Sequence, residues 1–371
     1  MAVHDHLRVP GQDRGPADHR APRSEAGHGR RRNLRRLLPL LWLSATLATA
    51  QAPRVGDINF YGLHKVTSER IVAATHLQTG ELLPPSKGAL EDAIEKISGV
   101  AAARIEAVCC DAARAILFVG IEEKGAAHAA FRSPPEGDAA LPEELLRDYH
   151  AYLGAVARAA RNGAAAEDLT AGHSQMADPQ ARALQDRFAA FAAEHIDQLR
   201  DVLSHAAEPE QRQIAAVVIG YAPRKAEVVN DLQVALQDPD EAVRANAVRS
   251  LTAFAVLAAT HPETSIAIAP TWFVEMLNSI VLSDRVEAAR ALVTLTDGSN
   301  TAALDQIRER ALAAVIEMAQ WKTPRYALPP FLLAGRLAGI PDAQIHQYWT
   351  SGRRAPVIQR AIGSASRRPL K

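Results

Sequence analysis

The sequence predicts a small α+β domain followed by an all-α solenoid. One observation is a frame, R-x-x-A-x-x-x-L/I, that occurs three times between residues 212 and 292. A second is composition: aromatic residues make up only 5% of the chain and alanine is abundant, which favours helices packed through small side chains. A third is that the apolar period changes several times within residues 54–125, as expected where strands alternate with helices.

The first fifty residues have the three parts of a secretory signal peptide. The basic run RRRNLRR is followed by LLPLLWLSATLATA, which ends in Ala48-Thr49-Ala50. This apolar run is shorter than the roughly 20 residues that cross a bilayer. We therefore expect residues 1–50 to be a signal peptide with a long n-region, cleaved after Ala50, and the protein to be exported to the periplasm or the cell exterior. The alternative is an uncleaved membrane anchor at residues 37–50, which is the one membrane contact that the sequence suggests.

Residues 51–125 predict a domain with the element order β-α-α-β-β. Residues 55–60 alternate as a strand does. Ser68 is expected to cap a helix that Gly80 ends, and Ser86 is expected to cap a second helix with apolar residues at helical spacing. Two further strands, joined by a polar turn, are expected at 103–108 and 116–121.

This order, together with the segments INFYGLHKVTSERI, TGELLPPSKGALEDAIEKI and LFVGIEEKG, resembles a POTRA domain. POTRA domains are periplasmic modules found beside outer-membrane assembly barrels and in cell-division proteins. The resemblance covers about seventy residues and implies a domain that binds polypeptide. Such binding often adds an extended segment to a sheet edge through main-chain hydrogen bonds.

The two cysteines of the chain, Cys109 and Cys110, are adjacent. Neighbouring residues of an extended chain point to opposite faces, so a regular disulfide between them is not expected. No C-x-x-C pair or second cluster supplies further metal ligands. We expect one cysteine to pack inward and the other to lie at the surface.

The remaining chain is predominantly helical. Residues 126–141 mix Ala, Gly and Pro without an apolar period and predict a linker. Residues 142–207 carry two apolar stripes and predict a helical hairpin region. Between the stripes, Gly172-His173-Ser174 lacks the strand-turn-helix context and the third member that nucleophilic catalysis needs, so we expect a turn there.

The repeated frame predicts stacked helical hairpins. Its three copies are separated by 32 and 41 residues, which is the range of helical repeats. The small alanine lets a neighbouring helix approach, and the larger residue one turn later fills the groove beyond it. The copies are Arg212, Ala215 and Ile219; Arg244, Ala247 and Leu251; and Arg285, Ala288 and Leu292.

The D-P-D turn before Arg244, the segment VRANAVRSL and the preceding DLQVAL are similar to HEAT repeats of the armadillo-like superfamily. The resemblance implies a superhelical solenoid over residues 208–362, in which each repeated arginine and the preceding acid form a structural ladder between units. Arg308 also fits the frame, but it lies only 23 residues after Arg285 and is expected on the other helix of that hairpin. Residues 363–371 form a basic tail.

The sequence indicates a scaffold that binds protein or peptide partners in the cell envelope. It contains no Walker A, HExxH, GxSxG or zinc-spaced cysteine pattern, so we assign no catalytic, cofactor-binding or metal-binding residue. A net charge of zero gives no electrostatic basis for binding nucleic acid. The alternative is an envelope enzyme with an unrecognised site in the helical domain, for which His150 and His173 are the residues to test.

The two halves are expected to bind separately, through a sheet edge and through the solenoid surface. Affinity at such a surface concentrates in a few aromatic or arginine side chains. The candidates for partner contact are Trp272, Phe273, Trp321 and Tyr326.

Export gives a direct prediction. The mature protein should begin at Gln51 and fractionate outside the cytoplasm, because Ala48-Thr49-Ala50 matches the small-residue cleavage pattern. Intact-mass measurement of protein from the native host checks this. A cytosolic protein that retains residues 1–50 would contradict it.

Overall fold

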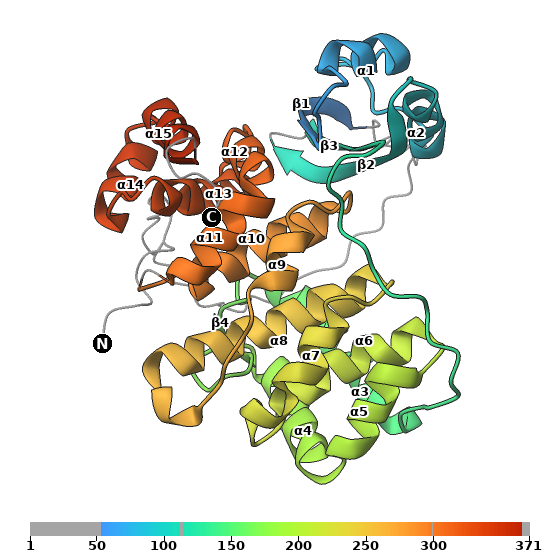
Figure 1. The fold of residues 1–371 in the computed structure, drawn as a ribbon. Helices are drawn as coiled ribbons and strands as arrows, with labels where there is room; N and C mark the ends of the chain where they lie inside the picture. Colours follow the sequence, from blue (N-terminus) through green and yellow to red (C-terminus); the bar gives the residue numbers. More distant parts are fainter. Residues whose placement is uncertain (1–52, 112–113, 299, 366–371) are drawn as a thin grey trace, which may run out of the picture. The chain divides into compact units, whose positions relative to one another are not determined.

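Segments rich in β-branched and apolar residues form a three-stranded sheet in the N-terminal part of the chain (Figure 1). The structure is a computed structural model that describes residues 53–365 except 112–113 and 299. The expected signal peptide and the last six residues of the expected basic tail lie outside this range. The elements of this part are β1 (Arg54–Tyr61), α1 (Ser68–Thr75), α2 (Lys87–Glu95), β2 (Val100–Asp111) and β3 (Arg114–Glu123).

β3 is the central strand of the sheet. It pairs parallel with β1 and antiparallel with β2, so that Val119 lies opposite Phe60 on one side and Ile105 on the other. The sheet order is therefore β1-β3-β2, and β1 and β2 are the two edges. Helices α1 and α2 cover one face, where Ile71 and Ile94 are fully buried against the strands. β2 includes Cys109 and Cys110, but their side chains lie outside the described part, so our expectation for them stays a prediction.

The helix caps differ in part from expectation. Ser86 caps α2 as predicted, because its hydroxyl accepts a hydrogen bond from Ala89 N at 3.1 Å. Ser68, however, is the first residue of α1 and not its cap. Thr67 holds the extended N-cap position, and the Ser68 hydroxyl donates to Glu69 at 3.2 Å. α1 also ends before Gly80, because His76 takes the left-handed conformation with φ 54°.

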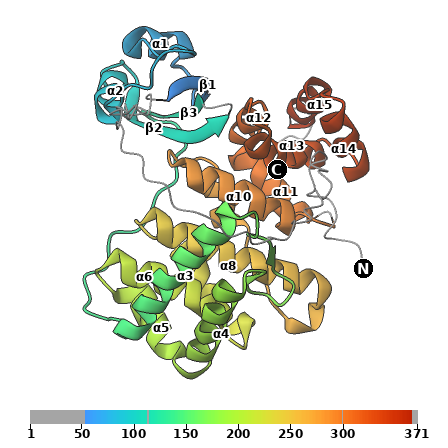
Figure 2. The same cartoon turned by 180° about the vertical axis from the view of Figure 1, so that it is seen from behind.

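After the non-helical segment 126–141, the described chain consists of helices and their connecting loops, with the two-residue strands β4 (Glu167–Asp168) and β5 (Gln175–Met176). α3 (Glu143–Arg161) and α4 (Pro179–Glu194) pack together on the face turned to the viewer in Figure 2. Three hairpins follow them. Their helices are α5 (Ile196–His205) with α6 (Pro209–Val218), α7 (Val229–Ala235) with α8 (Glu241–Thr260), and α9 (Thr271–Met276) with α10 (Leu282–Leu295).

The second helix of each hairpin carries the repeated frame, and α6, α8 and α10 pack side by side in that order. α13 (Pro324–Leu337) continues the row next to α10. The alanine and the larger apolar residue of every frame are fully buried. Ile219 lies just beyond α6, where the backbone tightens into a 3₁₀ turn. The other elements are η1 (Ile219–Tyr221), η2 (Lys225–Val228), η3 (Pro262–Thr264), α11 (Thr301–Arg310), α12 (Leu312–Ala319), α14 (Asp342–Thr350) and α15 (Ala355–Ala365).

Each frame arginine joins two successive turns of the array. Arg244 is 1% exposed, and its Nε and Nη2 donate to the Asp284 carboxylate at 2.9 and 2.8 Å. Its Nη1 donates to the carbonyls of Asp238 and Pro239, in the turn that precedes its own helix. The guanidinium therefore satisfies its donors within the core.

The same arrangement repeats along the array. Arg212 donates to both oxygens of Asp238 at 2.9 Å and to the carbonyls of the turn before α6. Arg285 donates to the Ser279 carbonyl at 2.5 Å and lies 3.4 Å from the Glu317 carboxylate. We call these three pairs the ladder. Arg308 is outside it, because α11 ends at Arg310 and separates Arg308 from the later positions of its frame.

The stretch expected to be a linker, residues 126–141, packs along the ladder. Arg132 donates to Asp238 at 2.7 Å, and its backbone N–H donates to the Gln237 carbonyl. The Phe131 ring lies 3.8 Å from the Arg244 guanidinium carbon. This segment is a strap held on the repeats, because Arg132 and Phe131 both contact residues of the ladder.

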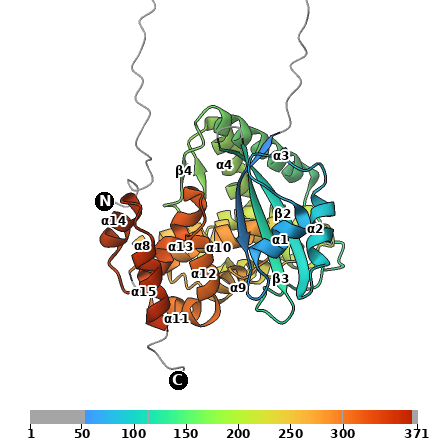
Figure 3. The same cartoon turned by 90° about the horizontal axis from the view of Figure 1, so that it is seen from above.

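One face of the sheet packs against the helical part, while the other face forms a core of its own with α1 and α2. The expectation that the two halves bind separately stays a prediction. Tyr61 and Phe118 are fully buried, and both pack edge-on against Trp321, with ring centres 5.9 and 5.0 Å apart. Seen from above, the sheet lies beside α10 and α12 (Figure 3). Residues Gln51–Lys371 accordingly form one compact unit. The physical reason is that the sheet face turned away from α1 and α2 is itself apolar.

One described helix, α8, is long and apolar enough to cross a membrane by length and composition. Its apolar residues face α6 and α10, and it carries the buried, paired Arg244. These contacts assign α8 to the core of the repeat array.

The ladder predicts a large loss of stability when one partner is removed. Arg244→Ala leaves the Asp284 carboxylate buried and unpaired, so we expect the free energy of unfolding to fall by about 3–5 kcal/mol in urea denaturation. Ala247→Leu should cost about 1–3 kcal/mol by overpacking. The control is Arg290→Ala, which removes an exposed pair with Glu287 and should cost no more than about 1 kcal/mol. An Arg244→Ala protein with full stability and lost partner binding would show that the frame is a recognition site.

Candidate functional site

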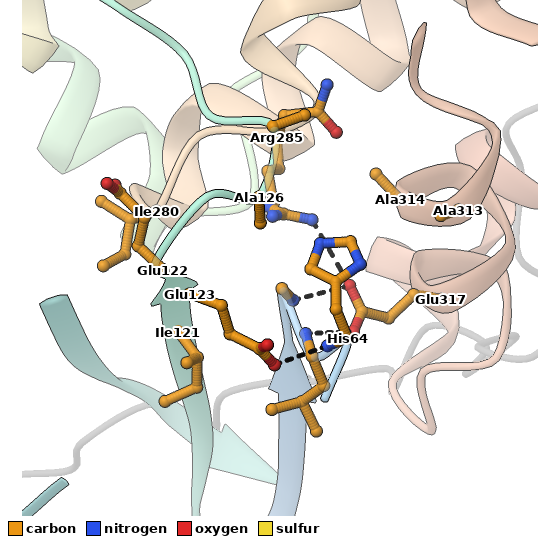
Figure 4. Close-up of a pocket in the computed structure, with 14 residues that line it drawn as sticks. His64, Ile121, Glu122, Glu123, Ala126, Ile280, Arg285, Ala313, Ala314 and Glu317 are labelled. Carbon is orange, nitrogen blue, oxygen red and sulfur yellow. Dashed lines mark hydrogen bonds and ion pairs between the residues drawn. The ribbon is translucent and has the colours of Figure 1, made fainter. Parts of the chain in front are cut away.

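The loop after β1 brings the sheet to the end of the ladder (Figure 4). Gly62 turns the chain with φ +78°, and a side chain there would meet the Ile121 carbonyl oxygen at 2.1 Å. Its N–H donates to Glu317 at 2.9 Å. The Leu63 N–H also donates to Glu317, at 3.5 Å, and the N–H groups of His64, Lys65 and Val66 donate to Glu123 at 2.7–2.9 Å. Two carboxylates thus hold one short loop.

Glu123 is a structural anchor. Burial works to raise its pKa, but the backbone N–H groups of His64, Val66 and Lys65 outweigh it and hold the pKa of Glu123 below its ordinary value. The carboxylate is therefore ionised at neutral pH. An ionised carboxylate has no proton to donate. Glu123 therefore accepts the backbone hydrogen bonds that close the loop.

Glu317, from α12, completes the last pair of the ladder. Burial raises the pKa of Glu317 and lowers the pKa of Arg285, and each opposite charge favours the ionised form of the other group. The Arg285 guanidinium also lies 4.7 Å from the centre of the Tyr61 ring, whose hydroxyl donates to the Ile280 carbonyl at 2.7 Å. The cavity beside these groups measures about 70 Å³, which suits ordered water better than an organic ligand.

A larger groove opens on the other side of Glu317. Its volume is about 640 Å³, and it is a shallow groove that is broadly open to solvent. One wall comes from β1 and the other from α12 and α15. The lining side chains used below are Ile58, Asn59 and Phe60 of β1, Leu312 and Ile316 of α12, Trp321 and Lys322 after it, and Ile362 of α15. We call this hollow the β1–α12 groove.

The four aromatic candidates for partner contact do not gather at one surface. Phe273 is fully buried and Trp321 is 3% exposed, so these two side chains are core residues and offer no open surface to a partner. Trp272 and Tyr326 are partly buried, and Tyr326 packs edge-on against Phe118. Helical spacing alone could not separate core aromatics from surface ones, because both kinds recur on a helix at the same period.

Gly172-His173-Ser174 lies in the turn between β4 and β5, as expected. The His173 ring nitrogens face Lys225 and Gln175, while the Ser174 hydroxyl accepts from Gln185 at 2.8 Å. Serine and histidine are therefore not joined as a nucleophile and base. His150 is exposed and lies 2.7 Å from Glu210.

Lys225 was not singled out from the sequence, yet it is 8% exposed. Its Nζ donates to the Gly220 carbonyl at 2.7 Å and lies 3.3 Å from His173 Nδ1. Burial lowers the pKa of Lys225 to about 7, and burial together with the Lys225 charge lowers the pKa of His173 to about 4. No sequence signal marks the pair, because its members are 52 residues apart and meet only through the packing of η2 on the β4–β5 turn.

Within the described residues, no group of three or more His, Cys, Asp or Glu side chains has the arrangement of a metal site. The cavity next to His173, lined by Tyr152, Tyr221 and Arg249, measures about 130 Å³. A partly neutral amine beside a neutral imidazole is chemically capable of proton transfer. The lowered pKa of the lysine, however, is also what burial without a carboxylate partner produces in any protein core.

Comparison with known proteins supports the helical part of this description. Residues 196–268 match the family model described as HEAT repeats. Among solved structures, a designed armadillo repeat protein is similar at 15% sequence identity, covering 50% of this chain and 93% of the designed one with a TM-score of 0.32. No curated protein matches the chain in sequence. The match over residues 196–268 supports HEAT repeats in this stretch, and such repeats typically act as protein-interaction scaffolds.

The buried amine predicts a pH-dependent cost to stability. The folded-state pKa of Lys225 is about 7 and its ordinary value is 10.5, so the unfolded chain binds more protons between these values and stability rises with pH across that window. Lys225→Met should be more stable than the parent at pH 7, with an advantage that shrinks by about 2 kcal/mol by pH 9 in urea denaturation. Lys322→Met, at an exposed position, is the control. A pH-independent difference for Lys225→Met would contradict the assignment.

Proposed function

We propose that this protein is a non-enzymatic scaffold of the cell envelope that binds other proteins. The observation that carries the proposal is the β1–α12 groove, a shallow, solvent-open surface built jointly by the sheet and the last helices of the repeat array. A scaffold needs a rigid surface, and the buried ladder holds α6, α8 and α10 in fixed register.

HEAT repeats favour this function on physical grounds. Stacked hairpins bury their apolar faces against their neighbours and leave long solvent-facing surfaces whose side chains are free to vary. Residues 196–268 match this family, and three consecutive hairpins carry the ladder. The proposed partners are proteins or peptides, and neither a cofactor nor a nucleic acid is part of the proposal.

The finer parts of the proposal concern the N-terminal region. The β-α-α-β-β order supports a POTRA-like domain over residues 51–125, and the basic run followed by an apolar segment supports export. A polypeptide-binding module exported together with a HEAT array suits a task in the assembly or organisation of the envelope. An uncleaved anchor at residues 37–50 would place the same scaffold on the membrane.

A second candidate function is enzymatic, and one observation favours it. Lys225 and His173 bring an amine of lowered pKa to an imidazole beside a small cavity. Such pairs occur at catalytic sites. Desolvation alone accounts for the lowered pKa, which is why we prefer the scaffold.

Affinity capture tests the two functions together. The full chain, cross-linked in the native envelope and purified by a C-terminal tag, should carry stoichiometric protein partners. Lys225→Met should capture the same partners, because Lys225 lies in the core and outside the groove. Failure to capture any protein, together with turnover of peptide, ester or glycan substrates that Lys225→Met abolishes, would favour the enzyme.

A further inference from the structure

The C-terminal end of the chain is strongly basic. Residues 343–371 contain no Asp or Glu. Their basic residues are Arg353, Arg354, Arg360, Arg367, Arg368 and Lys371. The whole chain has 42 basic and 42 acidic side chains, so the rest of it carries a matching excess of six negative charges. A charge separation of this kind suits the C-terminal end to an anionic partner.

The carboxylates of the fold do not neutralise this end. Arg353 and Arg360 are exposed and Arg354 is half-buried. No carboxylate of the described residues forms an ion pair with any of the three. The nearest acidic residue in the sequence, Asp342, is held by Arg336 through two hydrogen bonds at 3.1 and 2.6 Å. The three guanidinium groups are therefore available to a partner.

Two of these arginines lie against aromatic rings of α14. The Arg353 guanidinium carbon is 5.3 Å from the centre of the Tyr348 ring, and that of Arg354 is 4.2 Å from the centre of the Trp349 ring. Arg354 Nη1 also donates to the Trp321 carbonyl at 2.8 Å, which holds the turn after α14 close to the β1–α12 groove. Arginine, tyrosine and tryptophan suit a membrane–water interface, because each has an apolar body and a polar tip.

The β1–α12 groove supplies an apolar surface beside the basic end, since α15 packs on α12 and α13 (Figure 1). Its apolar lining includes Ile58, Phe60, Leu312, Ile316 and Ile362. The two nearby carboxylates are compensated, because Asp57 lies 3.5 Å from Lys322 Nζ and Glu317 pairs with Arg285. No net negative charge of the groove therefore opposes an anionic surface.

α15 presents an apolar and a basic side chain on its solvent side. Its buried side is formed by Val357, Ile358 and Ala361. Arg360 and Ile362 lie on the two flanks of the opposite side, about 160° apart around the helix axis. A flat surface that touches this side contacts both residues, because the long stem of an arginine lets its charged end reach outward.

These features together favour a lipid bilayer as the partner. The groove is shallow and open to solvent, so it does not enclose a small molecule as a ligand pocket does. An acidic protein would pair with the arginines but would leave Ile362, which is 41% exposed, beside charged groups. A bilayer with anionic lipids offers phosphates at its surface and acyl chains just below them.

We propose that the end formed by α14, α15 and the β1–α12 groove docks on a membrane that contains anionic phospholipids. The guanidinium groups of Arg353, Arg354 and Arg360 contact the lipid phosphates, and Ile362 reaches the boundary between the headgroups and the acyl chains. This surface is separate from residues 37–50, so a chain cleaved after Ala50 keeps it. The inference goes beyond the protein-binding function and does not depend on it.

Co-sedimentation with vesicles tests the proposal. The protein is residues 51–371, which form one compact unit and lack the apolar segment 37–50. The probes are vesicles of phosphatidylcholine alone and vesicles with about one third phosphatidylglycerol, since each arginine near an anionic surface adds about fivefold to the affinity. The partition coefficient should be at least about tenfold higher for the anionic vesicles and should fall as the salt concentration rises.

A matched pair of double variants locates the basic contact. Arg353→Glu with Arg360→Glu should lower partition into the anionic vesicles at least about tenfold. The control is Arg158→Glu with Arg161→Glu, at exposed positions of α3, which changes the net charge by the same amount and should leave partition within about twofold. Thermal unfolding of both variants confirms that they are folded.

A second matched pair locates the apolar contact. Ile362 and Val234, on α7, are 41% and 47% exposed, so both positions tolerate a polar replacement. Ile362→Asp places a charge at the headgroup boundary and should weaken partition at least about fivefold, whereas Val234→Asp should leave it unchanged.

Several outcomes would overturn the proposal. These are equal partition into neutral and anionic vesicles, and an equal loss in a variant and its control. Absence of vesicle binding, together with a captured acidic protein that Arg353→Glu with Arg360→Glu releases, would identify a protein as the partner. Absence of vesicle binding, together with a dimer that the same variant dissociates in sedimentation, would identify a second copy.

Protein capture distinguishes this inference from the scaffold function. Capture that persists in the Arg353→Glu, Arg360→Glu chain while vesicle binding is lost supports a membrane surface separate from the protein-binding one. Vesicle binding that follows the two matched pairs, without capture of any protein, also supports the membrane surface and contradicts the scaffold.

Discussion

A guanidinium enclosed in a helical core must satisfy its donors without water, and this constraint organises the repeat array. Arg244 meets it with the Asp284 carboxylate on one side and the carbonyls of its own preceding turn on the other. One side chain thus ties two turns together. Because the next arginine does the same, an error in the packing of one hairpin would leave a charge unpaired in its neighbour.

The last pair shows how the array ends. The C-terminal partner of Arg285 is Glu317, which comes from α12 and not from a D-P-D turn, and which also accepts from the Gly62 N–H of the sheet. Burial raises the pKa of Glu317. Arg285 and the backbone N–H groups of Gly62 and Leu63 stabilise its ionised form. The sheet is thereby part of the cap of the repeat array, and the groove is a consequence of the way in which it docks.

Local sequence patterns allowed the helical repeats and one helix cap to be predicted. The helical repeats follow from a fixed frame, and the Ser86 cap follows from a polar residue before an apolar stripe, because both depend on residues within one or two turns. Glu317, Lys225 and Trp321 could not be assigned, since their roles depend on contacts between residues that are 52 to 260 positions apart in the sequence. The strap was missed for a related reason: its composition is that of a linker, and only Phe131 on Arg244 and Arg132 on Asp238 show that it is held.

The span between Gly62 and Glu317 also affects synthesis. These residues are 255 positions apart, so at ribosomal rates of 5–20 residues per second the sheet waits roughly 10 to 50 s for the helix on which it docks. Tyr61 and Phe118 have no aromatic partner during that interval, because Trp321 has not yet been made. The nascent chain therefore carries an exposed apolar sheet face for most of its translation, and a holding chaperone would protect it from aggregation until α12 emerges.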